Sequence, residues 1–266
     1  MQTEVRVVAA AGRDGRTRLT RLEADGQLAV RATGTGPGGA ARVHLVGAAA
    51  GPLAGDEVRV ILEVGPGAAL EVGSAGASIV LPGRSPGGRA EVRTEIRVAA
   101  GGRLDLACEP TVVSAGADLR TALTVDAAPE AVVTVRDVVV LGRHGEPPGR
   151  WTARVSAAVG GLPVLRSTQH GILASARGAR AVAAVLALVS TGQDGGDPAV
   201  AARAVRSGDS WAVAAPLPAG GWSATAWGPD VIETYAALGR VVPGPRSRPR
   251  GAAGSTSPVQ AEWEPA

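Results

Sequence analysis

Few residues of this 266-residue chain combine a chemically active type with a position that suggests a site, and they are scattered along it. Glu109 is the most unusual of them, because it ends an alternating segment and directly precedes Pro110, where a strand ladder would break. A buried acid at such a point is a candidate site residue. Cys108 alternates with Leu104 and Leu106, which predicts a core thiol first and a soft metal ligand second.

A second group of such residues surrounds the segment 142–146. His144 and Glu146 are two positions apart, so on a strand their side chains would face the same side and could share a metal ion. In a glycine-bounded turn the two side chains need not converge, and a solvated turn is the alternative. Asp56 follows Gly55 at the start of a strand, and an acid at a glycine turn usually accepts hydrogen bonds from the backbone.

The composition excludes several classes of enzyme. The chain has no lysine, so it can form neither a Walker A phosphate loop nor a Schiff base. Its single cysteine excludes an internal disulfide and a cysteine-rich zinc site. The string Gly73-Ser74-Ala75-Gly76 lacks the spacing of a nucleophile elbow. We therefore expect a protein that is not an enzyme; a hydrolase with an unrecognised site is the weaker alternative.

Charge and hydropathy indicate the compartment. The formal net charge is +3 and the arginines are scattered among acids, unlike the basic stripe of a nucleic-acid-binding protein. The N-terminus lacks the apolar segment of a signal peptide. The longest apolar run, residues 181–189, is too short to span a bilayer. We expect a soluble, cytoplasmic protein that binds neither nucleic acid nor membrane.

Strand-like alternation is clearest over residues 58–139, where it recurs three times. Glycine or proline turns interrupt it, which is the signature of hairpins. The apolar residues that flank the first two turns, Val64 with Leu70 and Val98 with Leu104, have the same spacing. Three such hairpin units, stacked, predict a mainly β fold of facing antiparallel or mixed sheets, a solenoid-like sandwich.

About two short helices are predicted toward the C-terminus. Asp197-Pro198 is typical of a helix start, and that helix would end at Gly208. The second is predicted from Asp230 to Gly239. Its apolar face would consist of Val231, Ile232, Tyr235 and Leu238.

The remaining C-terminal segments complete one domain over residues 1–242. Residues 179–190 suit either a helix or a doubly buried strand, and we favour the strand. Residues 209–227 are expected to form two strands. The Pro- and Arg-rich segment 243–266 is predicted to be a disordered tail.

The order of several short motifs resembles the urease accessory protein UreD (UreH) family, with this chain as a divergent member. The resemblance covers nearly the whole folded part. The matching residues include Gly55, Asp56, Glu109, Pro110, Gly116, Gly145 and Glu146. The family usually has a Thr-x-x-Ala-x-Lys-x-Tyr stretch after its first hairpin, whereas residues 73–80 here contain neither the lysine nor the tyrosine.

The resemblance implies a non-enzymatic scaffold for nickel insertion into urease. It implies a complex, and possible dimers of that complex, with UreF, the GTPase UreG and the urease apoprotein. No tightly bound cofactor is implied; nickel would be handled in transit, with Asp56, Glu109 and Glu146 as candidate residues of the path. The alternative from another class is a β-sandwich module that binds a small molecule or glycan on exposed tryptophans such as Trp211.

Overall fold

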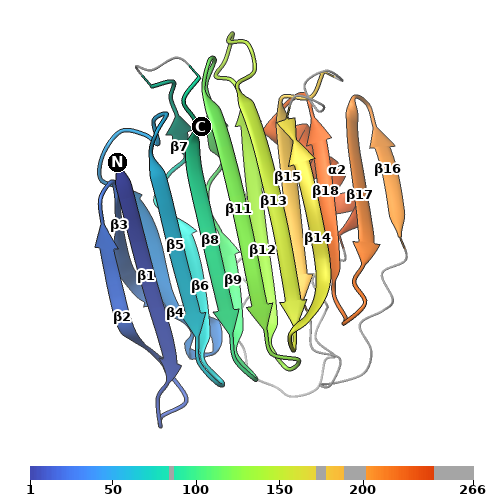
Figure 1. The fold of residues 1–266 in the computed structure, drawn as a ribbon. Coiled ribbons are helices and arrows are strands. Elements are labelled where there is room, and N and C mark those ends of the chain that lie inside the picture. The colour runs from blue at the N-terminus through green and yellow to red at the C-terminus, as the bar shows by residue number, and fades with distance from the viewer. Residues whose placement is uncertain (84–86, 172–177, 189–201, 243–266) are drawn as a thin grey trace, which may run out of the picture.

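The computed structural model describes residues 1–83, 87–171, 178–188 and 202–242, which form two β-sheets stacked face to face (Figure 1). The smaller sheet, called sheet A, has seven strands in the order β14-β13-β11-β8-β5-β1-β2. The larger one, sheet B, has the order β16-β17-β18-β15-β12-β9-β6-β4-β3, and the short strands β7 and β10 attach beside β12. The prediction of a mainly β, stacked-sheet fold is confirmed.

The strands are three to ten residues long. Sheet A consists of β1 (Gln2–Ala11), β2 (Thr17–Asp25), β5 (Glu57–Val64), β8 (Ala90–Val98), β11 (Asp118–Ala127), β13 (Arg150–Val159) and β14 (Leu162–His170). Sheet B consists of β3 (Leu28–Thr35), β4 (Ala41–Gly47), β6 (Ala69–Ser74), β7 (Ser78–Val80), β9 (Arg103–Ala107), β10 (Thr111–Val113), β12 (Val132–Leu141), β15 (Ala181–Leu188), β16 (Arg203–Ser207), β17 (Ser210–Pro216) and β18 (Trp222–Gly228). A short 3-10 helix, η1 (Pro37–Gly39), precedes β4.

The repeated units are arches and not hairpins, which corrects the sequence-based prediction. Strands β5 and β6 lie in opposite sheets, as do β8 with β9 and β11 with β12. Each strand pairs in parallel with the equivalent strand of the next unit, so that Val64 lies beside Val98 and Leu70 beside Leu104. Parallel stacking aligns the inward residues of successive units, which explains the equal spacing of these pairs around the turn.

The C-terminal region agrees with the predictions in its strands and differs in its helices. Strands β15, β17 and β18 form where strands were expected. The helix predicted from Asp197 to Gly208 is wrong at Arg203–Ser207, which form β16 and pair with β17. Gly208 has a φ of +61° in the turn between them, so this glycine closes a hairpin instead of ending a helix. The start of that predicted helix and the tail 243–266 lie outside the described residues.

Helix α2 (Val231–Val241) packs on the outer face of sheet B, behind β15, β17 and β18 (Figure 1). The carboxylate of Asp230 accepts a hydrogen bond from the Glu233 N–H at 2.8 Å and caps the helix as predicted. The predicted apolar face is half right: Leu238 is buried and Val231 packs against the same cluster, but Ile232 and Tyr235 are exposed. Thr234, Ala237 and Val241 complete the buried face, and the helix continues past Gly239, where it was predicted to end.

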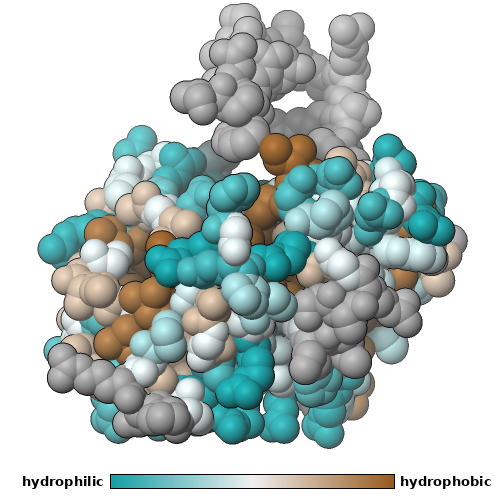
Figure 2. Space-filling view, turned by 90° about the horizontal axis from the view of Figure 1, so that it is seen from above, coloured by the Kyte–Doolittle hydropathy of each residue, from teal (hydrophilic) through white to brown (hydrophobic). Residues whose placement is uncertain are grey.

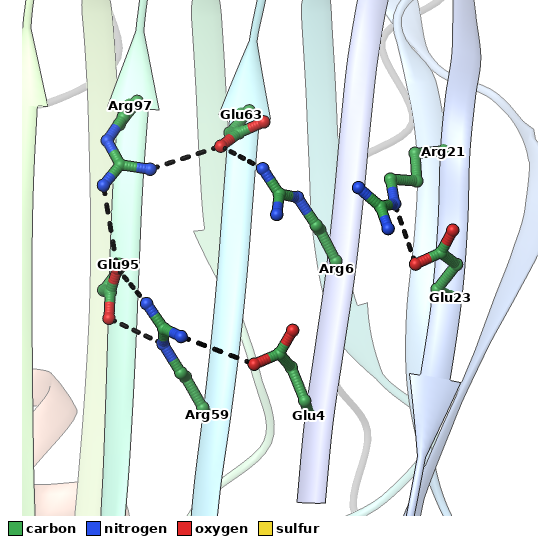
Figure 3. A network of polar contacts seen from close by, with 8 residues as sticks. All are labelled: Glu4, Arg6, Arg21, Glu23, Arg59, Glu63, Glu95 and Arg97. Carbon is green, nitrogen blue, oxygen red and sulfur yellow. Dashed lines mark hydrogen bonds and ion pairs between the residues drawn. The ribbon is translucent and has the colours of Figure 1, made fainter.

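The outer face of sheet A carries a network of ion pairs (Figure 3). Arg59 holds the Glu95 carboxylate with two hydrogen bonds of 2.8 and 3.0 Å and also approaches Glu4. Glu63 accepts from Arg6 at 2.9 Å and from Arg97 at 3.2 Å. Exposed pairs of this kind add little stability each, but they neutralise the β1–β8 half of this face.

Candidate functional site

A cavity of about 840 Å³ lies between the two sheets. The apolar residues between the sheets divide into a larger cluster that includes Leu62, Leu70 and Ile96 and a smaller one around Leu119 and Trp151. The cavity is lined by residues of both clusters and of both sheets. Its volume falls in the range of pockets that hold a small ligand.

The end of the sandwich that carries β7 is partly apolar. Ile79 of β7 lines the cavity and is 42% exposed, and nearby Leu53 is 37% exposed. Figure 2 shows the molecule from above, with hydrophobic side chains visible between polar ones. The residues that line the cavity also include the segments 49–52 and 75–81.

Asp137 places a carboxylate inside this cavity. It occupies an inward position of β12, between Val135 and Val139 of the two apolar clusters, and it lines the cavity. The side chain is accessible to solvent within the cavity. Burial raises the pKa of this carboxyl, and a backbone hydrogen bond from Val138 opposes the shift.

Cys108 lies beside Asp137. Ala107 of β9 is in register with Arg136 of β12, so the next positions along the two strands, Cys108 and Asp137, are neighbours that face the cavity. The pKa of the Cys108 thiol is raised to about 11. Burial is the largest cause, and the negative charge of Asp137 is the second. Cys108 therefore lies in the core as predicted, and it is a protonated thiol at neutral pH.

Further polar side chains from both sheets line the cavity. The side-chain amide of Gln169 on β14 donates to the hydroxyl of Thr225 on β18 at 3.0 Å and joins sheet A to sheet B. The indole N–H of Trp151 donates to the Thr121 hydroxyl at 3.3 Å. All four residues line the cavity, whose walls are otherwise mostly aliphatic.

Glu109 is the one sequence-predicted metal-path residue that lines this cavity. It lies just beyond the end of β9, where the ladder breaks, and its backbone N–H donates to the Ser74 hydroxyl at 2.9 Å. The side chain is exposed. Glu109 therefore lies beyond the end of its strand, whereas Asp137 lies within the length of β12, between the sheets.

Asp56 has local structural partners. Its carboxylate is buried and accepts hydrogen bonds from the Met1 amine at 2.5 Å and from the Leu53 N–H at 2.9 Å. Burial alone would raise the pKa of Asp56, but these hydrogen bonds outweigh it and the pKa is lowered. This geometry fixes the loop before β5.

Glu146 accepts hydrogen bonds from its own loop and from the loop between β10 and β11. The side chain of Arg143 donates to it at 2.7 Å, and the backbone N–H groups of Arg143 and Ala115 donate at 3.1 and 3.2 Å. The Arg143 side chain and these backbone donors lower the pKa of Glu146 to about 2. Gly116 and Gly145 have φ values of +75° and +76°, so these glycines of the motif are required by tight turns.

The structure does not gather the predicted acids into one metal centre. Within the described residues, no group of three or more histidine, cysteine or acidic side chains is placed to hold a metal ion.

Asp137 was not predicted from the sequence. The signal that could have found it is an acid at a position where the alternation of β12 requires an inward, apolar residue.

Comparison with known proteins identifies the family. The fold defines a class of β-sandwich proteins, with two sheets stacked face to face around an internal cavity. A family model described as UreD urease accessory protein matches residues 2–256. The chain therefore belongs to the UreD family of urease accessory proteins. In the described part of the chain, no helix has the length and apolar character needed to cross a membrane.

Individual relatives support this assignment. Urease accessory protein UreD 1 of Saccharopolyspora erythraea is 38% identical over 241 residues, which cover 88% of this chain and 91% of the relative. The UreD protein of Streptomyces avermitilis is 42% identical over 165 residues, or 62% of this chain and 65% of the relative. That of Frankia alni is 43% identical over 169 residues and 56% of each chain.

Proposed function

We propose that this protein is a non-catalytic scaffold for nickel insertion into urease and acts in a complex with UreF, the GTPase UreG and the urease apoprotein. Membership of the UreD family carries this proposal. The GTP chemistry would belong to the partner, since this chain has no lysine for a Walker A loop.

We further propose that the cation passes through the cavity between the sheets. The exposed Glu109 would attract the cation, and Asp137 would replace part of its hydration shell inside the cavity, because carboxylate oxygens bind divalent cations. The hydrogen bonds of Asp56 and Glu146 within their own loops favour structural roles for these two acids. The path therefore rests on Glu109 and Asp137.

The glycan-binding alternative is less well supported by the tryptophans. Trp151 and Trp222 are buried, and Trp227 is partly buried. Among the described tryptophans, Trp211 alone is exposed, at 40%. One exposed ring does not make the aromatic platform that such a module needs.

The experiment is co-expression of this chain with UreF, UreG and the urease subunits, followed by measurement of nickel per urease active site. We expect Asp137→Asn and Glu109→Gln each to lower the nickel content severalfold, while the accessory complex still co-purifies. Asp126→Asn is the matched control, because Asp126 is exposed on β11. Unchanged nickel loading in both variants would exclude this path, and failure of the co-expressed proteins to associate would contradict the proposed function itself.

A further inference from the structure

Sheet B extends sideways beyond the last strand of sheet A, at the edge formed by β17 and β16 (Figure 1). Sheet A ends at β14, and the hydrogen bond from Gln169 to Thr225 places β14 opposite β18. Strands β17 and β16 continue sheet B past this point. The inner face of β17 therefore has no facing strand among the described residues.

This uncovered face is partly apolar. On β17, Ala212 and Ala214 are buried in the cluster that includes residues of α2, so the alternating residues Trp211 and Val213 face the opposite side. Each of these two side chains is 40% exposed. The guanidinium of Arg206 on β16 lies 5.2 Å from the centre of the Trp211 ring. We call Arg206, Trp211 and Val213 the shelf.

The edge of sheet A next to the shelf is also unpaired. Strand β14 pairs with β13 on one side and with no described strand on the other. Its backbone groups on the free side can therefore pair with an added strand. Pro163 limits pairing at the start of β14, which leaves residues 164–170 as the available edge.

One added strand would cover both the free edge of β14 and the shelf. Gln169 of β14 meets Thr225, and Thr225 is in register with Val213. A strand added beside β14 would consequently lie opposite β17, and its inward side chains would cover Val213 and Trp211. Such a strand needs apolar residues at alternate positions.

The charges favour an acidic partner. Arg166 on β14 and Arg154 on β13 are exposed on the outer face, and Arg206 lies on the shelf. Within the described chain, none of the three makes a salt bridge, in contrast to the paired arginines of β5 and β8. A second copy of this chain is disfavoured, because antiparallel pairing about the centre of β14 would place Arg166 against its copy.

We propose that the free edge of β14 and the shelf together bind an extended strand of a partner protein in which apolar residues alternate with acidic ones. Backbone pairing would give affinity, the shelf would select the apolar positions on the inner face, and Arg166 and Arg154 would select the acidic positions on the outer face. The proposal does not depend on nickel, so the loading experiment above leaves it untouched.

The test uses the full chain and two blocked nine-residue peptides at millimolar concentration, one alternating valine with glutamate and one alternating valine with arginine. Amide hydrogen exchange of residues 164–170 and the fluorescence of Trp211 are measured. We expect the glutamate peptide to slow exchange severalfold and shift the emission, and the arginine peptide to do neither. Val213→Glu and Arg166→Glu should abolish the protection, whereas Leu22→Glu, at a comparably exposed aliphatic residue on β2, should retain it.

Three outcomes would overturn the proposal. The first is an absence of protection by the glutamate peptide, and the second is equal protection by both peptides. The third is a dimer of the unmodified chain, seen by sedimentation, that Val213→Glu dissociates, because the edge would then bind a second copy.

Discussion

Cys108 and Asp137 form a polar pair inside a largely aliphatic cavity. Each group alone is easier to bury in its neutral form, and the charge of Asp137 opposes ionisation of the thiol next to it. Neither residue has the dense hydrogen bonding that Glu146 has in its loop. The pair is therefore available to interact with a cation that enters the cavity.

The reactivity of Cys108 should report this environment. A thiol pKa of about 11 leaves almost no thiolate at neutral pH, so alkylation by iodoacetamide should be slow at pH 7 and rise steeply toward pH 11. Because the folded pKa lies above the ordinary value of 9.0, the protein should also lose stability as pH rises from 9 to 11. Mass spectrometry of the native and urea-unfolded chain measures the rates, and equal rates at pH 8 would contradict the burial of this thiol.

The acids show how far single residues can be predicted from the sequence. Glu109 lies at the end of a ladder and before Pro110, where the sequence placed it, but its side chain is exposed and not buried. The hydrogen bonds of Asp56 and Glu146 agree with the general preference of acids at glycine turns. Asp137 was missed, because a strand pattern indicates that a residue points inward but not that a cavity lies there.

At the scale of elements, an arch and a hairpin have the same sequence pattern. Both consist of an alternating segment, a glycine turn and a second alternating segment. The difference lies in the strand partners, which are about 30 residues away in the next unit, as for Val64 and Val98. The same limit explains β16, whose short sequence has few apolar residues and becomes a strand by pairing with β17.

Two turn glycines of this region should differ in their tolerance of alanine. Gly208 has a φ of +61° and open space around it, so Gly208→Ala should cost about 1–2 kcal/mol for the left-handed conformation alone. Gly221 has a φ of +85°, and a Cβ there would lie 2.1 Å from the Ala187 carbonyl oxygen. Gly221→Ala should therefore lower the free energy of unfolding clearly more than Gly208→Ala does. Urea unfolding of both variants measures the difference, and equal costs would show that the turn relaxes freely.

At the scale of the molecule, the cavity lies between the two sheets and is lined by residues of both inner apolar clusters. A sandwich whose purpose was stability alone would fill this space, because close-packed interiors are more stable. The open volume is consistent with the proposed passage of a cation.

A substitution that fills the cavity should lower nickel loading without lowering the stability of the fold. Ala184 lines the cavity on β15, in register with Asp137. Ala184→Leu would add three methylene-sized groups to empty space, so the free energy of unfolding should stay constant or rise by up to about 2 kcal/mol. Nickel loading of co-expressed urease should fall severalfold, because the side chain would obstruct the path beside Asp137. Ala236→Leu, on the exposed side of α2, is the matched control and should leave loading unchanged. Full loading by a stable Ala184→Leu protein would show that nickel does not pass through this cavity.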